Sequence, residues 1–256
     1  RAVKSCSQQL FVGFAAEDRY TIAEPLVYHL KNYGINTWYD RQALLLGDNR
    51  RKKNLEEGAE SSAYACIVIS KNTASSPCAM EEFFIIRDRF LRGDVTVFPV
   101  LYELSLKEIP TELQWVEEMI FKEVDRGSGT REICNHIACK ISSDLLENCS
   151  CKRISDILAA PAFTSAANAI LRSYQKVDCA NLNSRISLLY AAYLTIIHSA
   201  VLPHSTVMEL VHRIFERLFS ETQLNLKVDY RELWLLENVM CILVNYCLDN
   251  NTESSI

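Results

Sequence analysis

The sequence lacks an apolar segment long enough to cross a membrane. A membrane-spanning helix needs roughly 20 consecutive apolar residues, and even the stretch 188–202 is interrupted by His198. A secretory leader with an apolar core is also missing. These absences predict a soluble, cytoplasmic protein with no membrane partner. The chain begins at Arg1 without a methionine, so we expect the natural start to lie upstream.

An excess of positive charge is absent too. The formal net charge is -5 and the isoelectric point is near 5.6, which excludes the basic footprint that nucleic acids or acidic membrane surfaces require. The segment GFAAED after the first apolar run lacks the glycine triplet that brings a backbone against a dinucleotide. Redox use of NAD is therefore disfavoured.

The ten cysteines and five histidines form no metal-binding pattern. The closest cysteine pairs, 149 with 151 and 134 with 139, have no histidines at zinc-finger spacing. Reduced thiols acting as small core residues are the expected state in a cytosol. The histidines keep no triad or metal spacing with a carboxylate, so the sequence predicts neither a metal site nor a cofactor.

What the first half contains is an alternation of strand and helix patterns. Short runs rich in β-branched and aromatic residues occur at 10–15, 35–39, 63–70 and 95–102, and helical periodicity lies between them. Such nearly continuous apolar runs are typical of strands buried on both faces. Right-handed crossovers then predict a doubly wound parallel sheet, an α/β fold with 111–125 as its last sheet element.

The second half shows no convincing strand from about residue 130 onward. Its Leu, Ile, Ala and Tyr residues predict helices at 130–147, 152–175, 184–200, 205–220 and 229–248. Pro161 and Pro203 are interpreted as helix starts or kinks. The segment Gly127-Ser128-Gly129 is the best joint, so we expect two domains, residues 1–127 and an all-α domain at 128–256.

The most informative stretch is YACIVISKNTASSPCAMEEFF, residues 64–84, where an apolar run ends in a polar loop before a helix. Glu81 and Glu82 are expected to open that helix. Carboxylates at a helix start are common because they face the positive end of the helix dipole. A helix that follows a buried parallel strand, however, begins at the carboxyl edge of the sheet, where such folds bind ligands.

Three segments together resemble a known family. They are FVGFAAEDR at 11–19, GINTWYDRQALLLGD at 34–48 and ACIVISKNTASSPCAMEEF at 65–83. In order and spacing they are similar to the landmark segments of Toll/interleukin-1 receptor (TIR) domains of the bacterial, NAD-cleaving type. The resemblance covers residues 8–125 and implies a flavodoxin-like sheet. Pro77 stands where the family usually has tryptophan, while Cys78 and Glu81 keep the family spacing.

The resemblance implies cleavage of the bond between nicotinamide and ribose in NAD, with Glu81 as the catalytic residue and NAD as substrate. The chemistry is plausible on its own terms, because nicotinamide leaves as a neutral molecule from a cationic pyridinium and needs no general acid. One carboxylate that stabilises the oxocarbenium-like sugar then suffices. Glu82 is the nearest competitor, but it points about 100° around the helix.

Further site residues are implied by the same resemblance. Ala15, Ala16 and Asp18 follow the first strand and would bind the dinucleotide, whereas Trp38 and Asp40 would border the nicotinamide. Each has a simpler alternative. Asp18 suits the N-cap of a helix at 19–33, and Trp38 and Asp40 suit a buried aromatic followed by a turn.

The loop equivalent to the family's BB loop contains three leucines and a glycine, residues 44–47. Exposed leucines reduce solubility unless they meet a partner, so Leu46 and Gly47 are expected in an assembly contact that also borders the substrate. The basic run 50–53 is interpreted as a solvated face, with attraction of the diphosphate as the alternative. Cys78 is expected to pack beneath the catalytic loop rather than to act as a nucleophile.

Two functions therefore remain open from sequence. One is an NAD glycohydrolase or ADP-ribosyl cyclase in bacterial anti-phage defence. It would be activated by self-association through the TIR and helical domains, with an upstream sensor or activating ligand as a further expected partner. The other is a non-catalytic TIR adaptor. A receiver-like phosphoacceptor is disfavoured because no companion lysine follows the last strand. Water or the adenine would attack the ribosyl carbon, and the sequence does not choose between them.

Overall fold

A computed structural model describes residues 9–160, 164–200, 202, 204–224 and 228–253. Pro161 and Pro203 lie outside these residues, so their predicted roles stay predictions. Contacts divide the described chain into two compact units. The sheet unit comprises residues 9–31 and 35–134, and the helical unit comprises residues 32–34 and 135–253. The main division, between residues 134 and 135, falls within the helix Arg131–Leu146. The predicted domain boundary between residues 127 and 128 remains a prediction.

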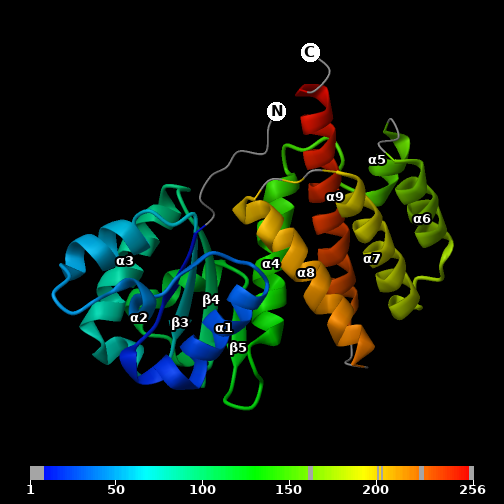
Figure 1. Cartoon of the computed structure of the whole chain (residues 1–256). Coiled ribbons are helices and arrows are strands. Elements are labelled where there is room, and N and C mark those ends of the chain that lie inside the picture. The colour runs from blue at the N-terminus through cyan, green and yellow to red at the C-terminus, as the bar shows by residue number, and fades with distance from the viewer. Residues whose placement is uncertain (1–8, 161–163, 201, 203, 225–227, 254–256) are drawn as a thin grey trace. The chain divides into compact units, whose positions relative to one another are not determined.

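The sheet unit confirms the doubly wound α/β fold (Figure 1). Its described strands are β1 (Leu10–Gly13), β2 (Thr37–Trp38), β3 (Tyr64–Ile69), β4 (Thr96–Tyr102) and β5 (Lys122–Val124). They pair in parallel in the order β2-β1-β3-β4-β5. The order reverses at β1, so the loops after β1 and β3 leave the carboxyl edge side by side. Ligands of such folds bind at this switch point.

The segments that connect the strands of the sheet unit contain more, and shorter, helices than the sequence pattern predicts. After β1 the chain forms η1 (Ala16–Asp18), the π-helical η2 (Arg19–Ala23) and α1 (Glu24–Asn32), where one helix was expected. Residues 111–125 contain a 3-10 helix before their strand. The remaining elements are α2 (Asp40–Ala43), the π-helical η3 (Arg51–Ala59), η4 (Thr73–Ser75), α3 (Pro77–Leu91), η5 (Leu106–Glu108) and η6 (Thr111–Glu118).

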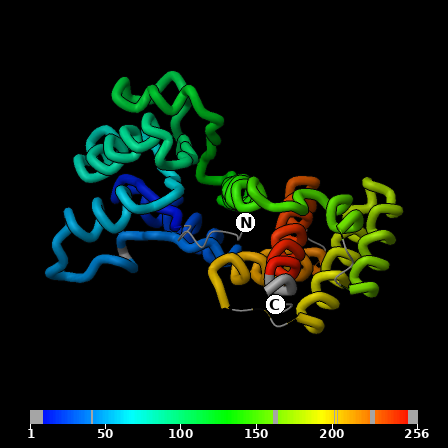
Figure 2. Tube along the Cα trace, turned by 90° about the horizontal axis from the view of Figure 1, so that it is seen from above, coloured from blue at the N-terminus to red at the C-terminus, as the bar shows by residue number. Residues whose placement is uncertain are grey.

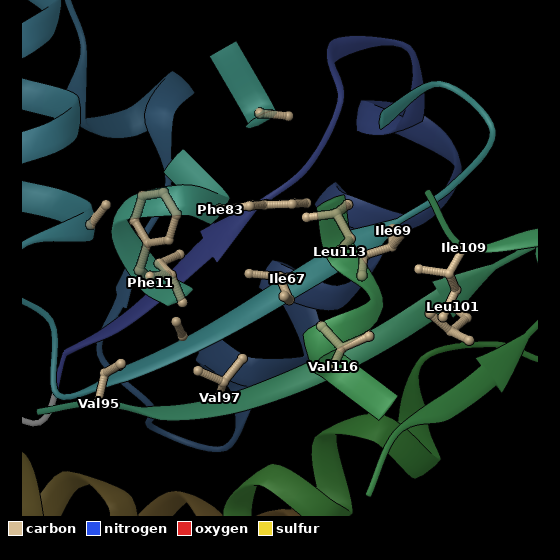
Figure 3. Close-up of a cluster of buried hydrophobic side chains, with 14 of the residues drawn as sticks. Phe11, Ile67, Ile69, Phe83, Val95, Val97, Leu101, Ile109, Leu113 and Val116 are labelled. Carbon is tan, nitrogen blue, oxygen red and sulfur yellow. The ribbon is translucent and has the colours of Figure 1, made fainter. Parts of the chain in front are cut away.

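One face of the sheet packs on α3 and η6 (Figure 3). Side chains alternate along a strand, and Ile67 and Ile69 of β3 lie in this cluster with Phe11 of β1 and Phe83 of α3. Gly13 permits the close approach of α3, because a Cβ there would lie 2.7 Å from Cε1 of Phe83. This packing determines where the first turns of α3 lie at the sheet edge.

The helical unit confirms the all-α prediction for the second half, since the described residues after 130 contain no strand. Residues 152–175 form two helices rather than one, because Ala160 is extended and Thr164 caps a new helix through a hydrogen bond to the Ala167 amide. Figure 2 traces the unit's helices in the green to red part of the chain. They are α4 (Arg131–Leu146, from residue 135), α5 (Ile154–Ala159), α6 (Ser165–Lys176), α7 (Leu182–Ser199), α8 (Thr206–Gln223) and α9 (Tyr230–Glu253). Among the described residues, no helix combines the length and apolar character that a membrane crossing requires.

Candidate functional site

Glu81 lies in the second turn of α3, at the carboxyl edge of the sheet. The helix begins at Pro77, with Ser76 as N-cap accepting a hydrogen bond from the Ala79 amide at 3.4 Å. The first turn contains no acidic residue, so the expectation that Glu81 and Glu82 open the helix was wrong. The dipole effect fades within the first turn. Stabilisation of the helix end therefore does not account for these two carboxylates.

The Glu81 side chain is 50% exposed and forms an ion pair with Arg50. Nη1 of Arg50 donates to Oε2 of Glu81 at 2.8 Å. This hydrogen bond, more than any other influence, raises the pKa of Arg50. Glu81 is thus a carboxylate that solvent reaches and that forms an ion pair with Arg50.

Glu82, its neighbour, is in a different environment. Its exposed fraction is 7%, and Nδ2 of Asn54 donates a hydrogen bond to its Oε1. Burial raises the pKa of Glu82 from 4.5 to about 7, against the lowering effects of Asn54 and Arg50. Of the two carboxyl groups, Glu81 is therefore the one that an external molecule can reach.

The sequence does not single out Arg50 or Asn54 as individual site residues. The basic run 50–53 was interpreted as a solvated face, and its Lys53 does pair with Glu57 on the surface at 3.1 Å. Arg50 instead turns to Glu81. The signal available in the sequence is the spacing of Arg50 and Asn54, because residues four apart, about one turn, lie on the same side of a helix. In the structure this side faces α3.

Asp18 connects the loops that follow β1 and β3. Its carboxylate is buried and accepts hydrogen bonds from Oγ of Ser70 at 2.5 Å and Nδ2 of Asn72 at 2.7 Å. Asp18 does occupy the N-cap position of η2, as the simpler alternative predicts, but its side chain makes no capping hydrogen bond there. Ala15 is buried and Ala16 is exposed. Contact of these three residues with a dinucleotide stays a prediction.

Trp38 and Asp40 lie near the end of β2. Trp38 is buried and stacks on Phe11 with ring centroids 5.4 Å apart. Asp40 accepts two hydrogen bonds of 2.9 Å from the guanidinium of Arg19, which also lies over the ring of Phe14 at 5.2 Å. The arrangement binds the loop after β1 to the segment after β2. A role of Trp38 and Asp40 beside nicotinamide remains a prediction.

The loop at 44–47 exposes two of its three leucines. Leu44 packs on the core cluster, which corrects the expectation of three exposed leucines, while Leu45 and Leu46 are exposed. Gly47 adopts a φ of +96°, a left-handed conformation that favours glycine. Asp48 accepts a hydrogen bond from the Leu45 amide at 2.8 Å. The loop therefore presents a short apolar tip closed by a polar turn.

Cys78 is exposed, so the expectation that it packs beneath the catalytic loop was wrong. The helix turns its neighbour Ala79 inward instead, and Ala79 is buried. The histidines of the described chain include His29, which bonds Thr130 at 2.8 Å, and His212, which bonds Tyr193 at 2.8 Å. No group of three or more His, Cys, Asp or Glu side chains in the described ranges is arranged to hold a metal ion.

Comparison with known proteins places these features in context. The family model described as "TIR domain" matches residues 10–127. The 2' cyclic ADP-D-ribose synthase AbTIR of Acinetobacter baumannii is 27% identical over 39% of this chain and 37% of its own length. The NAD(+) hydrolase TcpC of Escherichia coli is 28% identical over 50% of this chain and 41% of its own length.

The matches thus span about two fifths of these curated relatives. Among solved structures, the TIR domain of a Toll-related receptor from Hydra magnipapillata is similar, with a TM-score of 0.37 and 20% identity over 44% of this chain and 82% of that chain.

Proposed function

Because residues 10–127 form a TIR domain, we propose that this protein cleaves the bond between nicotinamide and ribose in NAD. The observation that carries the proposal is the accessible carboxylate of Glu81, on α3 directly after β3. Relatives similar over the same region are named as an NAD(+) hydrolase and a 2' cyclic ADP-D-ribose synthase, which supports NAD as the substrate.

In the proposed mechanism Glu81 acts on the ribose. Its carboxylate accepts hydrogen bonds from ribose hydroxyl groups and stabilises the positive charge that develops on the sugar carbon as the bond to nicotinamide breaks. The electron pair of that bond leaves with the pyridinium nitrogen, so nicotinamide departs uncharged without a proton. Water or a nucleophile within the substrate then attacks the sugar carbon, giving hydrolysis or cyclisation.

The resting ion pair opposes this chemistry. Arg50 at 2.8 Å neutralises the carboxylate that has to stabilise a cation. Substrate binding therefore displaces Arg50 from Glu81, and the negative diphosphate of NAD offers the arginine another partner. Exposed ion pairs of this kind contribute at most about 1 kcal/mol to stability, so substrate binding can separate Arg50 from Glu81 at a small cost in free energy.

Assembly is the second part of the proposal. Leu45, 76% exposed, and Leu46 form an apolar loop tip that gains from contact with another TIR domain. Such contact orders the loop, completes the pocket between neighbouring chains and activates cleavage. Depletion of NAD or release of a signalling nucleotide on activation suits bacterial anti-phage defence, with the helical unit responding to the activating signal.

The deciding experiment compares NAD cleavage by the wild type and by Glu81→Gln. Concentrated wild-type protein is expected to release nicotinamide, and the variant to lose about 100-fold or more of kcat, as when one group that stabilises a transition-state charge is removed. Asp88→Asn changes an exposed carboxylate on the same helix and serves as the matched control. Chromatography of the second product separates hydrolase from cyclase.

The adaptor alternative rests on the same exposed leucines. A TIR domain that acts only by contact needs a surface of this kind and no reactive carboxylate. Self-association detected by sedimentation, with no nicotinamide at any concentration that produces it, would favour the adaptor over the enzyme.

A further inference from the structure

The buried pair formed by Glu82 and Asn54 connects the two elements that carry the candidate site. Glu82 belongs to α3 and Asn54 to η3, and their exposed fractions are 7% and 5%. Nδ2 of Asn54 donates to Oε1 of Glu82. Oδ1 of the same amide is buried without a hydrogen-bond partner among the described residues. A buried acceptor left unpaired costs about 1–3 kcal/mol.

The chemistry of the two side chains suggests how that acceptor is satisfied. An ionised carboxylate only accepts hydrogen bonds, whereas a protonated one has an O–H to donate. A neutral Glu82 can accept from Nδ2 and donate to Oδ1 of Asn54 at once, so that the acid and the amide form a reciprocal pair. The raised pKa of Glu82, which burial causes, agrees with this neutral form.

Charged groups around Glu82 act in both directions. Arg50, which precedes η3, lowers the pKa of Glu82, while Asp40 of α2 and Glu81 of α3 raise it. Asp40 is already paired with Arg19, and Arg50 with Glu81. A proton on Glu82 therefore leaves one negative charge, that of Glu81, facing Arg50.

We propose that Glu82, as an uncharged acid paired reciprocally with Asn54, is a positioning residue that holds η3 against α3 and thereby sets the placement and charge of Glu81. The contact has two points, which involve residues about one turn apart at η3 and adjacent residues on α3. Asn54 meets Glu82 in the interior, and Arg50 meets Glu81 at the surface. Loss of the proton from Glu82 breaks its hydrogen bond to Oδ1 of Asn54 and adds a negative charge beside that of Glu81. Arg50 is then attracted to both carboxylates rather than to Glu81 alone.

Carboxyl ¹³C NMR of the full chain tests this directly. The Glu82 signal is assigned by its loss in Glu82→Gln, a variant whose amide can keep both hydrogen bonds to Asn54. We expect the Glu82 carboxyl to titrate near pH 7 and the Glu81 signal to shift at the same midpoint in the wild type but not in Glu82→Gln. The inference is overturned if Glu82 titrates near 4.5, the ordinary pKa of a glutamate. It is also overturned if the Glu81 signal does not shift at the midpoint of the Glu82 titration.

The consequence for catalysis rests on the proposed function. In the wild type, kcat/KM for nicotinamide release is expected to fall about tenfold per pH unit above pH 7, and Glu82→Gln to keep the value of pH 6 up to pH 8.5. Asn54→Leu should lower kcat at every pH, and Glu117→Gln, an exposed control, should follow the wild type. A wild-type pH profile in Glu82→Gln, or its complete inactivity, contradicts the positioning role.

The two proposals fail in different ways. If no condition yields nicotinamide, NAD cleavage is rejected, and the NMR titrations still decide whether Glu82 positions Glu81. If nicotinamide is released through Glu81 but Glu82 titrates as an ordinary carboxyl group, only the positioning role is rejected.

Discussion

At the scale of single residues, Glu81 and Glu82 show how neighbours on one helix acquire different chemistry. A step of about 100° along the helix places Glu81 at the surface beside Arg50 and Glu82 in the interior beside Asn54. This helical step predicts from sequence alone that the two side chains diverge. Arg50 and Asn54 could not be identified as partners from sequence, because they come from a segment about 30 residues earlier and only the packing of η3 on α3 brings them near.

Replacement of Arg50 tests the resting ion pair. Arg50→Gln removes the charge that neutralises Glu81, and we expect nicotinamide release by the isolated chain to rise, by no more than about fivefold, since exposed pairs contribute up to about 1 kcal/mol. Initial rates at low protein concentration measure this, with Arg87→Gln on α3 as control. A large rise in KM with reduced rate would mean that Arg50 mainly binds the substrate.

The buried Glu82 also predicts a pH dependence of stability. Its pKa is higher in the folded chain, about 7, than the 4.5 of an exposed glutamate. The folded state therefore holds the proton more tightly. The stabilisation is complete below pH 4.5 and is lost as the pH rises to about 7, by on the order of 3 kcal/mol.

Urea unfolding of wild type and Glu82→Gln at several pH values measures that difference, because the two chains contain the same titratable groups apart from Glu82. The free energy of unfolding of the wild type should decline relative to the variant between pH 4.5 and 7 and run parallel above it. Parallel curves throughout would place Glu82 in solvent.

At the scale of elements, the loop at 44–47 carries the prediction for assembly. Its flanks are anchored, by Leu44 on the core cluster and by Asp48 on the Leu45 amide, so Leu45 and Leu46 are presented without a partner in the sheet unit. The apolar run of three leucines is visible in the sequence. Which of them faces solvent is decided by the packing of α2 and η3 on the core.

The double variant Leu45→Ser/Leu46→Ser should weaken self-association and assembly-dependent NAD cleavage together. Each leucine buried in a contact contributes about 1.5–3 kcal/mol, so the association constant is expected to fall at least tenfold. Analytical ultracentrifugation measures it, and an unchanged melting temperature confirms that the fold is intact. Unaltered association would assign the contact to another surface. Leu91→Ser, an exposed leucine at the end of α3, is the matched control.

At the scale of the whole molecule, the chain forms two compact units whose residues are not contiguous in sequence. Residues 32–34, at the end of α1, group with the helical unit. Within that unit the Tyr33 hydroxyl donates to Oδ1 of Asn135 at 2.5 Å, and Asn135 donates to Glu232 at 2.9 Å. Glycine is required next to this network, because Gly34 has a φ of +73° and a Cβ there would lie 2.8 Å from the backbone oxygen of Glu209.

Gly34→Ala is therefore expected to destabilise the chain. A left-handed conformation costs a non-glycine residue about 1 kcal/mol or more, and the contact with the α8 backbone adds strain that a flexible side chain cannot relieve. Thermal unfolding should show a fall of several degrees in the melting temperature. Gly93→Ala, with a similar φ of +76° but open space around it, isolates the conformational cost, and equal effects of both variants would exclude the contact with α8.

The sequence by itself determined the parallel α/β fold, the helical second half and the presence of Glu81 on the helix that follows β3, because these depend on local periodicity and on which residues follow each strand. Only the tertiary structure decided what surrounds that carboxylate. Arg50 on Glu81, Asn54 on Glu82, Ser70 on Asp18 and Arg19 on Asp40 are contacts between segments distant in sequence. Such pairings, and the burial that separates Glu82 from Glu81, depend on how the helices pack against the sheet, and no local pattern of residues encodes that packing.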